Sequence, residues 1–98
     1  MYTPDRWVVF EIEKGMYKVL GGWSGGYLDG DSWRLNSGIE RVEEAPDAYL
    51  FHGNSGSVYE CGKGCYGLSM ATAHVATEIN KKEGTKMLPP DTDWMSLC

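Results

Sequence analysis

Hydrophobic and polar residues alternate with a period of two along the N-terminal part of the chain, which is the pattern of half-buried β-strands. Glycine, proline, asparagine and aspartate separate the alternating runs, as expected for turns. The predicted strands are 6–13, 16–23, 32–36, 39–44, 48–52 and 57–61. The first two form a hairpin across Lys14-Gly15. In 6–13, Val8 and Phe10 fall on one face and Trp7 and Val9 on the other.

The hydrophobic period then changes from strand-like to helical. Four apolar residues follow one another at helical spacing: Leu68, Ala71, Val75 and Ile79. This pattern predicts a helix over 68–83, with Ser69 as its N-cap and Gly84 as the residue that ends it.

The remaining segment, 84–98, has no clean period, and Pro89-Pro90 favours extended chain. Trp94, Met95 and Leu97 make it too apolar for an inert tail, because burying one such side chain is worth roughly 1.5–3 kcal/mol. We expect this tail to pack back on the sheet or to cross to a second subunit in a homodimer.

These elements predict an α+β fold in which an antiparallel sheet of about five or six strands carries one C-terminal helix across a face. A length of 98 residues fits one domain that spans 1–98. The domain is expected to be mainly strands over 1–61, helix over 68–83 and extended tail over 84–98.

Charge and composition exclude some classes of function. The net charge is −5 and no stripe of lysine or arginine is present, so direct binding to nucleic acid is disfavoured. No apolar run is long enough for a membrane span, and no basic and apolar leader opens the chain. We therefore expect a cytoplasmic protein whose 3 cysteines are reduced.

The most informative segment is 21–35, in which five glycines and three large aromatic residues lie close together. Flexible backbone beside rigid aromatic rings suits a contact surface better than a catalytic centre. The candidate binding residues are Trp23, Tyr27, Asp29, Asp31, Trp33 and Arg34. Tryptophan, tyrosine and arginine dominate binding hot spots, although the same aromatic residues could serve only as core and turn packing.

Motifs for metal binding are weak. Asp29-Gly30-Asp31 begins like a calcium loop, but Trp33 and Arg34 stand where an oxygen ligand and a sharp-turn glycine are needed. Ordinary turn formation is the better interpretation of these residues.

A zinc site would need Cys61 and Cys65 together with His52 and His74, whose spacing is not that of a zinc finger. Structural thiols are the simpler interpretation. No nucleophile can be matched with a base and an orienting acid, so we predict no enzyme activity, no metal and no cofactor.

Three segments carry a resemblance to known proteins: Tyr2–Phe10 (YTPDRWVVF), Gly22–Ile39 (GWSGGYLDGDSWRLNSGI) and Tyr49–Tyr59 (YLFHGNSGSVY). Together they resemble small proteins encoded by tailed bacteriophages. Such proteins have no established activity, so the resemblance assigns no role to any residue. It implies the cytoplasm of a bacterial host and an accessory role, such as blocking a host enzyme or a defence system.

Two functional hypotheses follow. The first is a non-enzymatic phage accessory protein that binds and inhibits a bacterial protein through a surface anchored by Trp23 and Trp33. Three acidic residues would steer a basic partner toward that surface: Glu40, Glu43 and Glu44. The alternative is a small-ligand binder that sequesters a nucleotide signal, with a base stacked on either tryptophan and Arg34 at the phosphate.

Overall fold

A computed structural model describes residues 1–13, 15–23 and 32–97. The strands are β1 (Arg6–Glu13), β2 (Met16–Trp23), β3 (Ser32–Leu35), β4 (Ile39–Glu44), β5 (Ala48–Gly53), β6 (Val58–Gly62) and β7 (Lys86–Met87). The helices are α1 (Met70–Asn80) and the short 3₁₀ helix η1 (Trp94–Ser96). The fold is α+β in the broad sense expected, with antiparallel strands and one α-helix among the described residues.

The strands form two sheets rather than the single sheet predicted. One has four strands in the order β3-β2-β1-β7, and the other has three in the order β4-β5-β6. The chain leaves the first sheet at Asn36, whose N–H donates to Val19 O at 2.9 Å. The Asn36 side chain then replaces the backbone as a partner, because its Oδ1 accepts from Val19 N at 2.7 Å. This side-chain hydrogen bond takes the place of a backbone hydrogen bond at the end of the β2–β3 ladder. The chain then continues into β4 of the other sheet.

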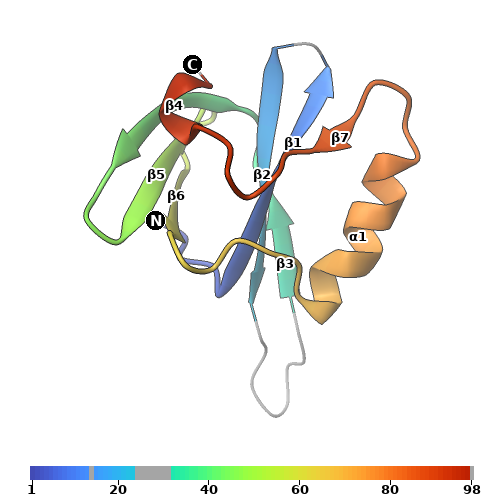
Figure 1. Cartoon of the computed structure of the whole chain (residues 1–98), viewed down its shortest axis with the longest axis horizontal. Coiled ribbons are helices and arrows are strands. Elements are labelled where there is room, and N and C mark those ends of the chain that lie inside the picture. Colours follow the sequence, from blue (N-terminus) through green and yellow to red (C-terminus); the bar gives the residue numbers. More distant parts are fainter. Residues whose placement is uncertain (14, 24–31, 98) are drawn as a thin grey trace.

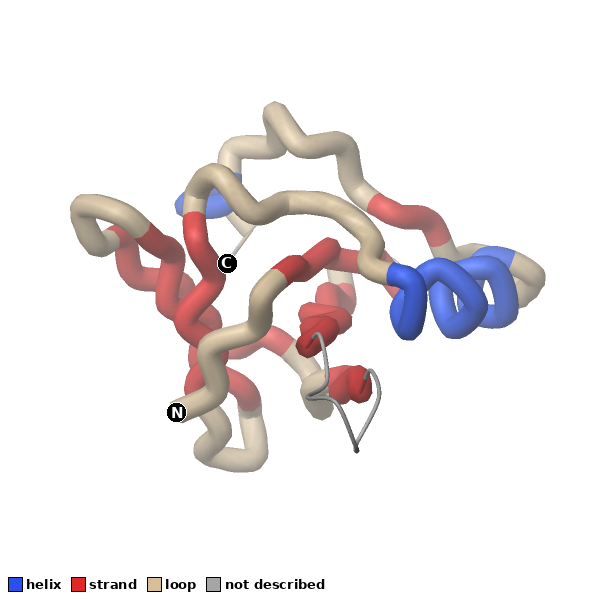
Figure 2. The backbone as a smooth tube through the Cα atoms, turned by 90° about the horizontal axis from the view of Figure 1, so that it is seen from below, coloured by secondary structure: helices blue, strands red, loops and turns tan. Residues whose placement is uncertain are grey.

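The four-stranded sheet is the middle of three layers, with α1 on one face and the three-stranded sheet on the other (Figures 1 and 2). The alternation predicted for 6–13 is confirmed. On the helix side Val8 and Phe10 pack with Ile79, whereas on the other side Trp7 and Val9 join the core of the second sheet. Apolar residues on both faces of β1 therefore reflect burial on both sides.

Helix α1 has the predicted N-cap but is shorter than the predicted 68–83 at both ends, because it runs from Met70 to Asn80. Ser69 is the N-cap, and its hydroxyl accepts from Thr72 N while its own N–H donates to Thr72 Oγ1 at 2.7 Å. The helix stops at Asn80 instead of continuing to residue 83. Thr85 Oγ1 contacts the carbonyls of Ile79 and Lys82 at 2.7 Å, which satisfies groups that the helix end leaves open.

The buried stripe of α1 matches the prediction in part. Ile79 is buried as predicted, and Val75 is partly buried and packs against the same cluster. Thr72 and Ala76 are buried as well, whereas Leu68 precedes the helix and is 39% exposed. The side chain of Ala71 lies outside what the structure describes.

Gly21 and Gly22 lie inside strand β2 and allow two segments to approach it closely from opposite sides. A Cβ atom on Gly22 would lie 2.6 Å from Ser69 Oγ and 2.7 Å from Thr72 Cγ2. On the other side, a Cβ atom on Gly21 would lie 3.0 Å from Pro4 Cβ. These two glycines of the glycine-rich segment thus serve packing rather than loop flexibility.

The C-terminal tail packs back on its own chain. Residues of β7 pair with Phe10 and Glu11 of β1, a short strand that the sequence pattern did not predict. Trp94 is 4% exposed, and its ring centroid lies 5.2 Å from that of Trp7 and 5.3 Å from that of Tyr66. Met95, expected to be buried with it, is 43% exposed. The homodimer stays a prediction.

Candidate binding surface around strand β3

Of the six predicted binding residues, the structure describes Trp23, Trp33 and Arg34, and these three do not share one face of the sheet. Tyr27, Asp29 and Asp31 lie outside the described residues. The β2–β3 register sets Trp33 opposite Gly22 and Trp23 opposite Ser32. Because neighbouring positions along a strand point to opposite faces, Trp23 and Trp33 lie on opposite faces of the sheet. The two rings cannot stack on the same base or fill the same pocket of a partner.

One face carries Trp23 and Arg34 together with Tyr2. The Arg34 Cζ atom lies 4.5 Å from the centre of the Tyr2 ring, which is a cation–π contact. The rings of Tyr2 and Trp23 meet edge to face at 6.3 Å, and Trp23 Nε1 donates to Thr3 O at 3.1 Å. The N-terminal segment thus completes this cluster, with Trp23 half-buried and Arg34 exposed.

Tyr2 is not among the predicted binding residues, because nothing near it in the sequence signals its partners. Tyr2 reaches the cluster by pairing with the edge of β6, where its N–H donates to Val58 O at 2.8 Å and its carbonyl accepts from Glu60 N at 2.7 Å. Its ring also lies 5.1 Å from that of Tyr59. Burial raises the pKa of the Tyr59 hydroxyl, and the positive charge of Arg34 opposes part of that shift.

The opposite face of β3 presents Trp33. Its side chain is 50% exposed, whereas Trp7 and Trp94 are buried and Trp23 is half-buried. Leu35, on the same face as Trp33, packs against the cluster of Phe10 and Leu20 beneath the helix. Leu35 therefore packs this face of the strand against the core, and Trp33 remains half exposed.

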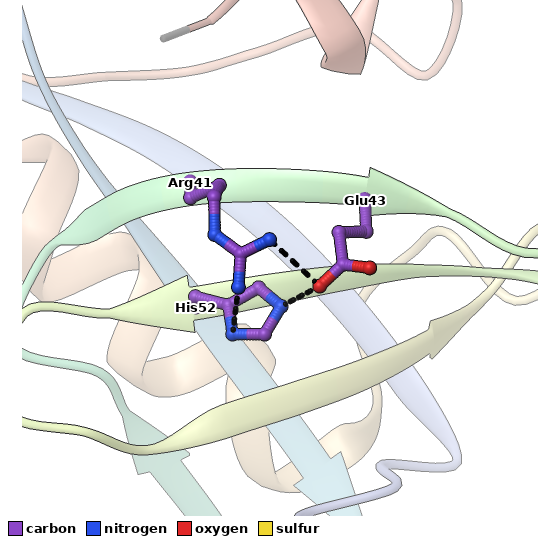
Figure 3. Close-up of polar contacts among 3 residues, drawn as sticks. All are labelled: Arg41, Glu43 and His52. Carbon is purple, nitrogen blue, oxygen red and sulfur yellow. Dashed lines mark hydrogen bonds and ion pairs between the residues drawn. The ribbon is translucent and has the colours of Figure 1, made fainter.

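A separate polar cluster lies on the three-stranded sheet (Figure 3). Glu43 Oε1 contacts His52 Nε2 at 2.6 Å and accepts from Arg41 Nη1 at 2.9 Å, while Arg41 Nη2 lies 3.5 Å from His52 Nδ1. Both ring nitrogens of His52 therefore lie in polar contacts within this cluster.

The acidic residues predicted to steer a partner are partly paired. Glu43 belongs to the cluster with Arg41 and His52, and Glu44 Oε2 accepts from Lys63 Nζ at 2.6 Å. These contacts neutralise much of the local negative charge on β4. The steering of a basic partner by these residues stays a prediction.

The structure does not bring the candidate zinc ligands together. Cys61 is fully buried in the core, whereas the β4–β5–β6 register sets His52 on the opposite face of that sheet. His74 is exposed on α1. Within the described ranges, no group of three or more histidine, cysteine, aspartate or glutamate side chains is placed to share a metal ion.

Burial makes Cys61 an unreactive thiol. Loss of hydration raises its pKa, and the nearby Glu60 and Cys65 raise it further. Because the thiolate is the nucleophile, we expect iodoacetamide at pH 8 to alkylate the partly exposed Cys65 well before Cys61 in the folded protein. Peptide mapping by mass spectrometry measures the two rates. In denaturant both cysteines should react alike, and equal rates in the folded protein would contradict the buried position.

None of the described helices is long and apolar enough to cross a lipid bilayer. Comparison with known protein families, with curated proteins and with solved structures finds no match to this chain.

Proposed function

We propose that this chain is a non-enzymatic accessory protein of a tailed bacteriophage that binds and inhibits a bacterial protein in the host cytoplasm. The observation that carries the proposal is the half-exposed Trp33 next to the exposed Arg34 on strand β3. A large aromatic ring left in water on a rigid strand costs free energy that contact with a partner would recover. Tryptophan and arginine are also the residue types that contribute most to protein interfaces.

The structure of β3 supports a protein partner better than a nucleotide. A nucleotide site needs an exposed aromatic ring and a phosphate-binding group on one face, but Trp33 and Arg34 lie on opposite faces of the strand. Trp23 shares the face of Arg34, but it is half-buried and packs edge to face against Tyr2. A protein partner can contact both faces of an exposed strand, because it is large enough to reach around the edge.

Affinity capture from bacterial lysate tests the proposal. We expect the wild-type protein to retain one host protein in stoichiometric amount. Trp33→Ala should weaken that complex by about thirtyfold, the effect of losing a hot-spot contact of ~2 kcal/mol. Isothermal titration with the purified partner measures the change, and an activity assay of the partner tests inhibition.

Met16→Ala is the matched control, because Met16 is 44% exposed on the adjacent strand and outside the proposed surface. Its complex should be as tight as that of the wild type. Failure of the folded wild-type protein to retain any stoichiometric partner would refute the proposal. Equal losses for both variants would place the binding surface elsewhere.

A further inference from the structure

The edges of the two sheets differ in how well they are protected. Strand β4 carries a bulge between Ile39 and Arg41, and strand β6 is covered by hydrogen bonds with Tyr2. Strand β7 has two residues and is followed by Pro89 and Pro90. Bulges, very short strands and covering segments are the devices that prevent a sheet edge from pairing with other chains. Strand β3 has none of these among the described residues.

The open edge of β3 presents the backbone groups of Trp33 and Leu35. Asn36 N–H donates to Val19 O, so the backbone of Asn36 points toward β2. In an antiparallel pair the direction of the backbone N–H and C=O groups alternates from residue to residue. The backbone groups of Arg34 therefore also point toward β2. The N–H and C=O groups of Trp33 and Leu35 consequently point outward.

We propose that the edge of β3 takes up an extended segment of the partner protein as an added strand. This segment carries a carboxylate opposite Arg34 and apolar residues opposite Trp33 and Leu35. The inference rests on the proposed function and names the chemistry of the partner. Backbone hydrogen bonds to an edge supply affinity, and alternate side chains supply specificity.

The alternation of β3 determines the pattern of the bound segment. Residues opposite Trp33 and Leu35 form hydrogen-bonded pairs, so the residue opposite Arg34 in an antiparallel complex sits in a non-hydrogen-bonded pair, where side chains lie closest. The Arg34 Cζ atom lies 4.5 Å from the centre of the Tyr2 ring, and the residue is exposed. A guanidinium carries five N–H donors, so it can bind a carboxylate while it keeps this contact. On the other face, Trp33 offers apolar area to the residue beside it.

The same alternation disfavours a second copy of this chain as the occupant. If two copies paired antiparallel through this edge, Trp33 of each copy would lie opposite Leu35 of the other. The two Arg34 side chains would then lie directly opposite each other. Like charges in that position are destabilising. A segment with a glutamate or aspartate at the same place replaces this repulsion with attraction.

Short capped peptides test the inference. The parent peptide has a valine–glutamate–valine centre flanked by threonines, and nuclear magnetic resonance titration follows the backbone amides of β3. We expect the amides of residues 33–35 to shift on binding. Replacing the glutamate with lysine should weaken binding by roughly fivefold to tenfold, as attraction at one cross-strand pair becomes repulsion.

N-methylation separates backbone pairing from side-chain contact. Methyl groups on the two valine nitrogens remove the donors that face β3 and should abolish binding. A methyl group on the glutamate nitrogen, which faces away from β3, should leave binding nearly unchanged. Binding of the valine-methylated peptide as tightly as the parent would overturn the strand-addition geometry.

Arg34→Glu should reverse the preference, so that the lysine peptide binds more tightly than the glutamate peptide. Arg41→Glu makes the same change of charge on the other sheet and should keep the wild-type preference. Unchanged preference in Arg34→Glu, or no binding of the parent peptide to the folded wild-type protein, would overturn the inference.

Lysate capture with Arg34→Glu separates this inference from the proposed function. If the variant captures the host protein as well as the wild type does, the function stands and the inference about β3 is wrong. If the peptides bind as expected but the wild type captures no host protein, the edge site stands and the proposed function is wrong.

Discussion

Replacing Trp94 with alanine should lower the melting temperature by more than about 10 °C. The Trp94 ring is buried among Trp7, Phe51 and Tyr66, which come from both sheets and from the segment before α1. Removing a buried tryptophan side chain costs ~3–5 kcal/mol, and each ~1 kcal/mol lowers the midpoint by ~4–8 °C in a domain of this size. Thermal unfolding followed by circular dichroism measures the shift.

Met95→Ala is the control for this prediction, since Met95 is the next residue and is 43% exposed. It should melt within a few degrees of the wild type. Deleting residues 90–98 removes Trp94 together with the partly buried Leu97 and should destabilise the protein at least as much as Trp94→Ala. A Trp94→Ala protein that melts like Met95→Ala would show that the tail does not complete the core.

Gly22→Ala should also be strongly destabilising. The added Cβ atom would fall 2.6 Å from Ser69 Oγ and 2.7 Å from Thr72 Cγ2, so the start of α1 would have to move away from β2. Both contacted residues, Ser69 and Thr72, exchange the hydrogen bonds that cap the start of α1. Moving them would therefore also disturb the start of the helix. Overpacking of this kind costs ~1–3 kcal/mol, which corresponds to a fall of about 5–20 °C in the melting temperature.

Gly64→Ala is the matched control, because a Cβ atom at Gly64 meets nothing within 4 Å. Its backbone conformation does not require glycine, so alanine there should be neutral or slightly stabilising. If Gly22→Ala and Gly64→Ala melt alike, the close approach of α1 to β2 is not present in solution.

The sequence predicts the local elements well because each depends on neighbouring residues. Alternation in 6–13 identified β1 and which residues share each of its faces, and Ser69 marked the start of α1. The two-residue strand β7 lies in a segment without period, so only its pairing with β1 defines it. Where the chain passes from one sheet to the other, the Asn36 side chain takes over a backbone position in the ladder, and no hydrophobic pattern signals that contact.

The candidate site was harder to predict than the fold. Trp23 and Trp33 lie on the neighbouring strands β2 and β3. Whether their side chains share a face depends on the register between these strands, because a slip of one residue moves a side chain to the other face. Tyr2 joins Arg34 through the edge of β6, a contact that no local pattern encodes. Gly21 and Gly22 fall within the predicted strand 16–23, but sequence alone cannot show which segments approach that strand.

The contact between Trp7 and Trp94 joins residues that lie far apart in the sequence and therefore bears on the order in which the protein can fold during its synthesis. During translation, β1 and β2 leave the ribosome before β6, α1 and the tail, with apolar residues on both faces and neither covering layer yet complete. The core around Trp7 cannot close until Trp94 has also emerged. Strand β1 is therefore the part of the fold that stays incompletely covered longest, and a chain truncated before Trp94 would leave the Trp7 side of β1 without part of its cover.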